Sequence, residues 1–352
     1  MPQQLRVGLI GYGLGGKVFH ATLIQAVPEM RIVAVQSRTP DRRAQAAAEL
    51  GCKTYATVEE LLGEPSLDLV VISTPHDQHR DQVVAALTAG KHVVVDKVMA
   101  LSLAEADEMI AAAERAGRHL SVFQNRRWDG DFLTVRKVLD EGLLGAPLIA
   151  ESRVAGYARG RPPTWRSFRA HGGGPFRDWG AHIVDQALLL FGPVASVWAH
   201  FTYADEYDVE TAGECHLLHR SGVRFVYESG YVTRRPRPRW FLRGTLGTLE
   251  KHGLDPQEAR LKEGQVEGIS PRWGPYEPRD LWAQVTTEVA GVPAELVIET
   301  LPGRYVSYYE QIAGVLLRGA EPAVRLAEVR EEVRVLDAAA QSAASGEVVH
   351  LS

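Results

Sequence analysis

The chain has 352 residues, of which 45% are hydrophobic and 24% charged, and its formal net charge is −5. This length suggests two globular domains, and the weak negative charge excludes the basic surface of a nucleic-acid-binding or anionic-membrane-binding protein. The two cysteines form no disulfide framework, no apolar run has the length of a membrane span, and no signal peptide precedes the first predicted strand. We therefore expect a cytoplasmic protein.

The first third of the chain alternates strand patterns with helix patterns. Strands are expected at Leu5–Ile10, Arg31–Gln36, Leu67–Ser73 and His92–Asp96, with a further strand at His119–Phe123. Helix signals lie between them: Thr39-Pro40-Asp41 begins one helix, and Ser102 with Glu105 forms a capping box for another that ends at Gly117. Repeated β-α-β units predict a doubly wound parallel sheet, so residues 1–124 are expected to form a Rossmann NAD(P)-binding domain.

The pattern changes after Gln124. The glycine run Gly172–Gly174 precedes a helix that is predicted to end near Phe191. Strands are expected at Gly145–Val154, Val194–Tyr203, Thr211–His219, Val223–Val232 and Trp240–Gly244. The stretch Gly253–Arg279 is predicted to be loops, and helices near Tyr305–Arg318 and Leu326–Ser345 close the chain. Residues 125–352 are thus expected to form an α+β catalytic and oligomerisation domain with an open, mostly antiparallel sheet.

A glycine-rich loop follows the first predicted strand. Gly11, Gly13 and Gly16 fit the pattern G-x-G-x-x-G, with Tyr12 and Leu14 between them. The first glycine permits a tight turn, the second lets the backbone approach a pyrophosphate, and the third allows close helix–strand packing. A simple glycine-rich turn is the alternative, but the position between a strand and a helix favours dinucleotide binding.

The end of the second predicted strand bears on the choice of coenzyme. An NAD site usually has an acid here for the ribose hydroxyls, but this chain has Gln36-Ser37-Arg38. Ser37 can hydrogen-bond to a 2′-phosphate and Arg38 can pair with it. We therefore predict NADP, with NAD as the alternative if Arg38 is only a solvated surface charge.

Several motifs in order resemble those of one family. They are GYGLGGKVFH at 11–20, TPHDQH at 74–79, GKHVVVDK at 90–97, NRRWDGDF at 125–132, GGPFRDWGAHIVD at 173–185 and YVSYY at 305–309. The chain resembles the glucose–fructose oxidoreductase / inositol dehydrogenase (Gfo/Idh/MocA) family, and most of all its NADP-dependent scyllo-inositol dehydrogenase-like branch. One departure is Asp96-Lys97-Val98, where the family usually has Glu-Lys-Pro, so a rigid turn is missing.

The resemblance implies a catalytic set of Lys97, Asp178 and His182. Lys97 ends a predicted central strand, where a lysine can stabilise a developing oxyanion. Asp178 and His182 share one helical face, and a histidine there can accept a hydroxyl proton. The alternative from the residues alone is a helix N-cap at Asp178 and a core histidine at His182.

The remaining candidates would hold coenzyme or substrate. The coenzyme set is Gly11, Tyr12, Gly13, Leu14, Gly16, Ser37, Arg38, Thr74, Pro75, His79, Asp96, Lys97 and Asn125. The substrate set is Lys97, Asn125, Tyr157, Trp165, Asp178 and His182, and Arg159 and Arg161 lie in the same basic, aromatic loop. Solvated surface arginines are the alternative for that loop. The pairs His76–His79 and His216–His219 are not expected to bind metal, and Tyr309 is expected in the core.

Together these features predict an NADP-dependent dehydrogenase that acts on a secondary alcohol or ketone of a cyclic polyol or sugar, such as an inositol. A non-catalytic NADP-binding regulator and a nicotinamide-dependent glycosidase are the alternatives. A small-molecule substrate is expected, but neither nucleic acid nor a membrane. The open sheet predicts a homodimer or homotetramer.

Overall fold

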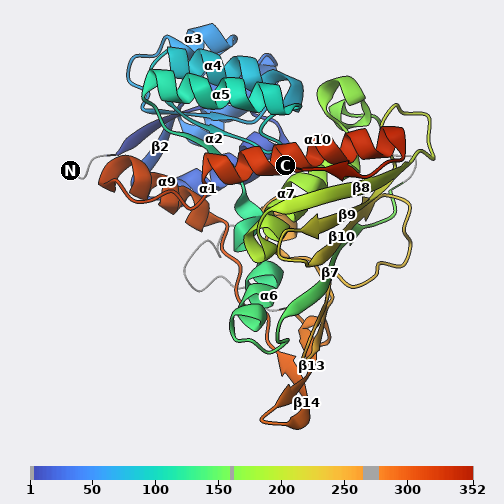
Figure 1. Cartoon of the computed structure of the whole chain (residues 1–352). Helices are drawn as coiled ribbons and strands as arrows, with labels where there is room; N and C mark the ends of the chain where they lie inside the picture. Colours follow the sequence, from blue (N-terminus) through green and yellow to red (C-terminus); the bar gives the residue numbers. More distant parts are fainter. Residues whose placement is uncertain (1–3, 159–161, 265–276, 352) are drawn as a thin grey trace. The chain divides into compact units, whose positions relative to one another are not determined.

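The computed structural model describes residues 4–158, 162–264 and 277–351, which divide into two compact units (Figure 1). Among the described residues, the first unit comprises 4–125, 258–264 and 305–330, and the second comprises 126–257, 277–304 and 331–351. Each unit has its own sheet and its own buried core.

The first unit contains a parallel sheet. Its strands are β1 (Leu5–Ile10), β2 (Met30–Gln36), β3 (Lys53–Tyr55), β4 (Leu69–Ile72), β5 (His92–Val95) and β6 (Leu120–Val122). The order β3-β2-β1-β4-β5-β6 confirms the predicted doubly wound fold. Every residue of β4 is buried because both faces of the sheet are covered. The strand order reverses between β1 and β4, and ligands of such sheets bind beyond the carboxyl ends of the strands at that point.

Helices connect these strands, and two of the predicted caps are present. The helical segments are η1 (Gly15–Ala21, a π-helix), α1 (Thr22–Gln25), α2 (Pro40–Leu50), α3 (Val58–Leu62), η2 (His76–Gln78), α4 (His79–Thr88), α5 (Leu103–Ala116) and α9 (Val306–Arg318). The Ser102 hydroxyl accepts a hydrogen bond from Glu105 N at 3.2 Å, and Gly117 ends α5 in the left-handed conformation. The Glu105 carboxylate accepts from Leu101 N.

The second unit contains a larger sheet. Its strands are β7 (Pro147–Ala155), β8 (Val194–Thr202), β9 (Ala212–His219), β10 (Arg224–Gly230), β11 (Trp240–Gly244), β12 (Thr248–Lys251), β13 (Ala283–Val289), β14 (Val292–Ile298) and β15 (Val349–His350). Within the described ranges, their order is β14-β13-β12-β11-β7-β10-β9-β8-β15, and only β7 and β10 pair in parallel. The predicted open, mostly antiparallel sheet is therefore confirmed.

Among the described residues, helices cover one face of this sheet and leave the other uncovered. The helical segments are η3 (Asn125–Trp128), α6 (Gly130–Asp140), η4 (Trp165–Ser167), η5 (Arg169–His171), α7 (Pro175–Phe191), η6 (Arg279–Leu281) and α10 (Leu326–Ser345). Helix α7 packs on β9 and β10, whose residues Leu217 and Tyr227 are buried beneath it. On the opposite face Trp198 and Val226 are only partly buried and Leu218 is 43% exposed.

The structure corrects the predicted loop at Gly253–Arg279. Helix α8 (Gln257–Lys262) lies there and is supported by an i,i+4 ion pair between Glu258 and Lys262, while residues 265–276 lie outside the described ranges. Six residues are too few for helical periodicity to be recognised in a sequence.

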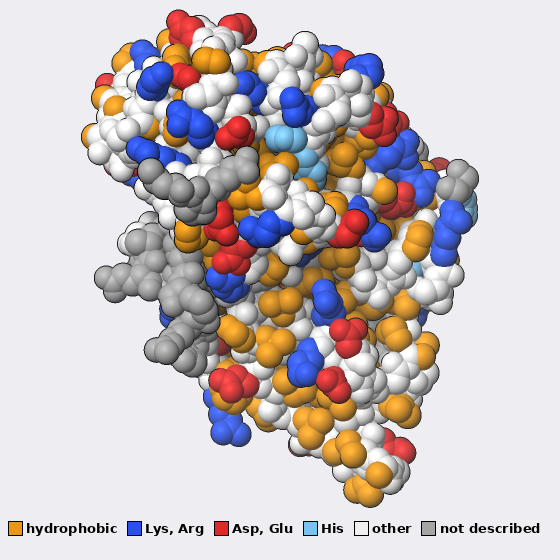
Figure 2. Space-filling model, turned by 90° about the vertical axis from the view of Figure 1, so that its left-hand side faces the viewer, with side chains coloured by type: hydrophobic (Ala, Val, Ile, Leu, Met, Phe, Trp, Pro, Cys, Tyr) orange, Lys and Arg blue, Asp and Glu red, His pale blue; other side chains and the backbone are white. Residues whose placement is uncertain are grey.

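The hairpin of β13 and β14 was also missing from the sequence-based prediction. Its turn uses Ala290 and Gly291, both at positive φ, rather than the Asn-Gly or Asp-Gly pair that marks such turns. Figure 2 shows hydrophobic side chains at the tip of the second unit, where Val289 and Val292 of this hairpin are 49% and 62% exposed. In the part of the chain that the structure describes, no helix combines the length and the hydrophobicity that crossing a membrane requires.

Candidate active site

The glycine-rich loop after β1 is fixed by two close backbone approaches. Gly11 has φ of +91°, and a Cβ atom there would lie 2.3 Å from the carbonyl oxygen of Ser73. A Cβ atom on Gly16 would lie 2.0 Å from the carbonyl oxygen of Gly11. Neither position can hold a larger residue, so both glycines are required by the turn itself.

Gly13 differs from these two because its Cβ position is almost open. Among the described residues, the one heavy atom within 4 Å of that position is Nη1 of Arg42, at 3.7 Å. Packing therefore does not require a glycine here. An open backbone beside the amino end of η1 matches the close approach that a pyrophosphate needs, so the loop fits a dinucleotide.

Tyr12 and Leu14 occupy different environments in this loop. Tyr12 is buried, and its hydroxyl donates to Glu49 of α2 at 2.7 Å. Burial, together with Glu49, raises the pKa of the Tyr12 hydroxyl. The Tyr12 side chain thus ties the loop to α2, whereas Leu14 is 59% exposed.

Three arginines follow the end of β2, and only Arg38 among them was predicted to bind the coenzyme. Ser37 is buried and accepts from Thr39 N at 3.3 Å, whereas Arg38 is exposed. Arg43 donates to the carbonyl oxygens of Ser37 and Arg38 at 2.7 and 3.1 Å. These hydrogen bonds fix the backbone of the turn between β2 and α2. Arg42, whose Nη1 lies near Gly13, was not predicted as a site residue; the signal was its place among the arginines at positions 38, 42 and 43, which follow β2 closely.

Asp96 and Lys97 directly follow β5. The Asp96 carboxylate accepts from Lys97 N at 2.8 Å and from the Ser73 hydroxyl at 3.2 Å, and it lies 3.4 Å from Nε2 of His20. Burial opposes ionisation of Asp96, but the hydrogen bond and charge of His20 outweigh it and hold the pKa of Asp96 below its ordinary value. Lys97 is partly buried, and the peptide bond between Lys97 and Val98 is cis.

A buried histidine–tyrosine pair supports this carboxylate. His20 and Tyr309 are both fully buried, and Nδ1 of His20 lies 2.6 Å from the Tyr309 hydroxyl. Tyr309 is therefore a core residue, as expected. His20 was missed, because its partners Asp96 and Tyr309 lie 76 and 289 residues away in the sequence.

Thr74, Pro75 and His79 lie together after β4. His79 is buried, with Nδ1 2.7 Å from the carbonyl oxygen of Val98 and Nε2 3.1 Å from that of Thr74. Burial lowers the pKa of His79. His79 therefore links the loops after β4 and β5, while Pro75 precedes η2. Asn125, buried at the start of η3, makes no side-chain hydrogen bond within residues 4–158, 162–264 and 277–351.

The first turn of α7 in the second unit is anchored by side chains from the sheet side. Its N-cap residue, Gly174, has no side chain; instead Glu210 accepts from Phe176 N at 2.8 Å. A Cβ atom on Gly174 would lie 2.1 Å from the Glu210 carboxylate. Tyr227 donates to the carbonyl oxygen of Phe176, and Ser229 donates to that of Pro175 at 3.1 Å.

Asp178 and His182 follow in the first two turns of this anchored helix. Asp178 N donates to the carbonyl oxygen of Gly174 at 3.2 Å, so the predicted N-cap alternative for Asp178 is wrong: Gly174 is the N-cap residue. His182 is 5% exposed, and the Trp179 ring lies edge-on to it at 6.1 Å. The Asp178 carboxylate lies 3.4 Å from Nε of Arg166.

Arg126 and Arg127, which follow Asn125, also make contacts that stabilise helix α7. Arg127 forms a two-point ion pair with Asp185 at 2.8 and 2.5 Å, and the Gln186 side chain donates to the carbonyl oxygen of Arg126. The Arg126 guanidinium also stacks on Trp179 at 4.6 Å. Arg126 and Arg127 lie in the motif NRRWDGDF, and Trp179 and Asp185 lie in the motif GGPFRDWGAHIVD, but their supporting role was not predicted.

The aromatic candidates of the loop after β7 are each paired with an arginine. Arg234 lies 3.6 Å from the centre of the Tyr157 ring, and Arg166 lies 4.3 Å from that of Trp165. Only Trp165 is linked to Asp178 by these contacts, through Arg166. Arg159 and Arg161 lie outside the described residues.

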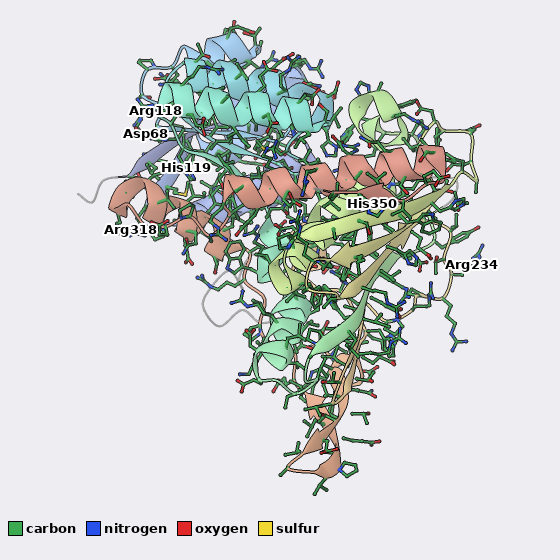
Figure 3. The ribbon with its side chains drawn as sticks, in the orientation of Figure 1. Asp68, Arg118, His119, Arg234, Arg318 and His350 are labelled. Atoms are coloured by element: carbon green, nitrogen blue, oxygen red, sulfur yellow. The ribbon has the colours of Figure 1, made fainter. Side chains whose placement is uncertain are left out.

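The first unit also contains a pocket at the amino end of its parallel strands, whereas coenzymes bind beyond the carboxyl ends. It measures about 360 Å³ and is lined by Arg118, His119 and Leu120 and by residues 322 and 324–326. Figure 3 shows Arg118 and His119 near Asp68, which precedes β4, so this is the amino end of the strands. Burial lowers the pKa of His119 to about 4. Among the described residues, no group of three or more His, Cys, Asp or Glu is placed to hold a metal.

Comparison with known proteins identifies the family. A profile of the oxidoreductase family with an NAD-binding Rossmann fold matches residues 5–124, and that of the GFO/IDH/MocA C-terminal domain matches residues 132–250. The chain belongs to the Gfo/Idh/MocA family. It is an NAD(P)-binding oxidoreductase.

Relatives match over nearly the whole length. The chain is 35% identical to the uncharacterized oxidoreductase YdgJ of Escherichia coli, covering 97% of each protein. It is 33% identical to the scyllo-inositol 2-dehydrogenase (NADP(+)) IolW of Bacillus subtilis, covering 96% of this chain and 93% of that protein. The solved oxidoreductase YPO2259 of Yersinia pestis is similar with a TM-score of 0.91 and 33% identity, covering 100% of this chain and 98% of that one.

The anchoring of α7 leads to a test on Glu210. Glu210→Ala should lower the free energy of unfolding by about 1 kcal/mol or more, because the helix loses its cap. Glu210→Gln keeps an acceptor oxygen and should lose less. Burial raises the pKa of Glu210 above its unfolded value, so its contribution to stability is largest at acid pH and falls as pH rises through the folded pKa.

The measurement is urea unfolding from pH 5 to 8. The wild type should gain stability relative to Glu210→Gln as the pH falls. Glu206→Ala, an exposed acid in the same loop, serves as the control. Equal stability of Glu210→Ala and Glu206→Ala would show that Glu210 does not cap α7.

Proposed function

We propose that the protein is an NADP-dependent dehydrogenase that oxidises a secondary alcohol of a cyclic polyol or sugar, such as an inositol, and catalyses the reverse reduction. The observation that carries the proposal is the placement of Asp178 and His182 on consecutive turns of the anchored start of α7. The similarity to IolW, whose name states an inositol substrate and NADP, supports it. We propose a cytoplasmic location, and we propose that residues 1–124 bind the coenzyme and that residues 125–352 carry the catalysis, with 258–264 and 305–330 of the latter packed in the first compact unit.

The coenzyme would be held mainly by the loops after β1, β2, β4 and β5. The main chain at Gly11, Gly13 and Gly16 would accept the pyrophosphate, and Ser37, Arg38 and Arg42 would bind the 2′-phosphate. The remaining proposed contacts are the main chain of Tyr12 and Leu14, then Thr74, Pro75, His79, Asp96, Lys97 and Asn125. When bound, the coenzyme supplies a nicotinamide carbon that accepts or donates the hydride.

The proposed catalytic residues are Lys97, Asp178 and His182. The imidazole of His182 takes the proton of the substrate hydroxyl, and the Lys97 ammonium donates a hydrogen bond to the same oxygen as its negative charge grows. Asp178 orients His182 or holds a neighbouring hydroxyl. Asn125, Tyr157 and Trp165 are the further substrate residues in this proposal.

The uncovered sheet face of the second unit supports a homodimer or homotetramer. Its partly exposed apolar residues Trp198 and Val226 lie on either side of His216, each in register with it on an adjacent strand. Charged pairs alternate with them, such as Arg153 with Glu228 at 3.1 Å. Extended faces of mixed apolar and paired polar residues are typical of subunit interfaces.

The oligomer can be tested with light scattering at micromolar concentration. The wild type should be larger than a monomer, and Trp198→Glu combined with Val226→Glu should yield monomers, because two charges enter an apolar contact. Leu148→Glu changes an exposed leucine of β7 on the other face of the sheet and should leave the assembly intact. A monomeric wild type would contradict the proposal.

The coenzyme preference can be tested on the arginines after β2. Arg38→Ala and Arg42→Ala should each weaken NADP far more than NAD, by on the order of 1–3 kcal/mol, because a charge-assisted contact is lost. Fluorescence titration gives both affinities, and Arg115→Ala, on α5, is the control. Equal losses for the two coenzymes would show that these arginines do not bind the 2′-phosphate.

The catalytic roles can be tested by substitution with coenzyme affinity measured separately. His182→Ala should lower kcat by roughly 10²–10⁴-fold through lost proton transfer, and Lys97→Ala by roughly 10²–10³-fold through lost oxyanion stabilisation. The wild-type oxidation rate should rise as the imidazole of His182 loses its proton, and this pH dependence should vanish in His182→Ala.

The assay follows NADPH absorbance with a free polyol. Net NADP reduction also separates this function from a regulator and from a nicotinamide-dependent glycosidase. His252→Ala and Lys137→Ala, at partly exposed and exposed positions of the second unit, are the controls. A near-parental kcat with an unchanged pH profile in His182→Ala would mean that another group is the base.

A further inference from the structure

The loop before α7 holds Arg166 in a defined position. Thr164 caps the short helix η4 by accepting from Arg166 N at 3.2 Å, and its own N–H donates to the Ser167 hydroxyl. The carbonyl oxygen of Arg166 accepts from Gly174 N at 3.0 Å. It also lies 2.2 Å from where a Cβ atom on Gly173 would be, so only glycine permits this approach. The backbone of Arg166 is therefore fixed against the start of α7.

The side chain of Arg166 is oriented by two further contacts. Its guanidinium lies 4.3 Å from the centre of the Trp165 ring, and its Nε lies 3.4 Å from the Asp178 carboxylate. Stacking on an indole restricts the plane of the guanidinium. Yet the side chain is 47% exposed, and within the described ranges it donates no hydrogen bond. A preoriented fork of N–H donors is thus left available beside Asp178.

The neighbouring arginines do not share this property. Arg169, in the same loop, donates to the carbonyl oxygen of Asp208 through both Nε and Nη2, at 3.1 and 3.0 Å. Arg177, on the first turn of α7, lies 3.8 Å from the Asp337 carboxylate. Of these three described arginines, Arg166 therefore combines a fixed backbone and an exposed side chain with N–H donors that make no hydrogen bond, although its charge pairs with Asp178.

We propose that Arg166 binds a carboxylate on the substrate, so that the substrate is an acidic sugar or acidic cyclic polyol, such as a uronate. This rests on the proposed function and narrows its substrate class. The planar guanidinium matches a carboxylate with two parallel hydrogen bonds. A carboxylate suits the site better than a phosphate, because Arg166 already lies beside Asp178 and a second negative charge on the ligand would have no counter-charge.

The test compares matched acids and neutral sugars. D-Glucuronate with D-glucose, and D-galacturonate with D-galactose, differ in the carboxylate alone. In the NADPH-loaded wild type, the acid of at least one pair should bind 10-fold or more tightly than its neutral partner, because a charge-assisted contact is gained. The readouts are quenching of tryptophan fluorescence, with Trp165→Phe to assign the signal, and saturation-transfer NMR. Binding of the acid should weaken as salt is added.

Variants separate a direct contact from general electrostatics. Arg166→Gln should remove the preference for the acid, and Arg166→Lys should restore part of it, because lysine keeps the charge but lacks the fork. Arg169→Gln removes the same charge from the loop and should leave the preference unchanged.

The outcomes distinguish this inference from the proposed function. If neither acid binds the wild type better than its neutral partner, or if Arg166→Gln weakens acid and neutral sugar equally, Arg166 serves only Asp178 and the inference is wrong. If the acid binds with the expected preference but neither acids nor inositols reduce NADP, the anion site stands and the proposed dehydrogenase activity is wrong.

Discussion

The carbonyl oxygen of Ser73 lies so close to Gly11 that no side chain fits between them. This contact joins the ends of β1 and β4, the two strands at which the sheet order reverses, and it sets the path of the phosphate loop. The Ser73 hydroxyl then donates to Asp96 after β5. One backbone approach and one hydrogen bond therefore place the ends of three parallel strands with respect to one another, and the first unit's site residues depend on them.

Buried and partly buried carboxylates fix neighbouring groups in both units. Asp96 accepts from a backbone N–H and a hydroxyl, Glu210 accepts from the first turn of α7, and Asp185 accepts from the Arg127 guanidinium. Each acid holds a backbone segment or a cation close to a proposed catalytic residue. Burying a charge is costly unless it is paired and hydrogen-bonded, so each acid requires its partner group to stay in place. The same requirement gives the site its rigidity.

The sequence predicted the elements that have strong local signals. Strand β1, strand β11 and helix α10 begin and end where the patterns indicated, and Gly117 ends α5 as expected. Contacts between distant residues could not be predicted. Glu210 caps a helix 34 positions before it, and His20 bonds Tyr309 across 289 positions. A glutamate in a polar loop and a histidine in a helix carry no local pattern that reveals such partners.

The position of Asp178 bears on the role proposed for the start of α7. The amino end of a helix favours negative charge, and Asp178 lies in the first turn, one turn before His182. Arg166 adds a second positive group on the solvent side of the same carboxylate. The first turn of α7 and the Arg166 guanidinium thus both place positive charge close to the Asp178 carboxylate. A hydroxyl beside this pair meets an acceptor at Asp178 and an imidazole at His182, so orientation and proton removal can be divided between two residues on one helix face.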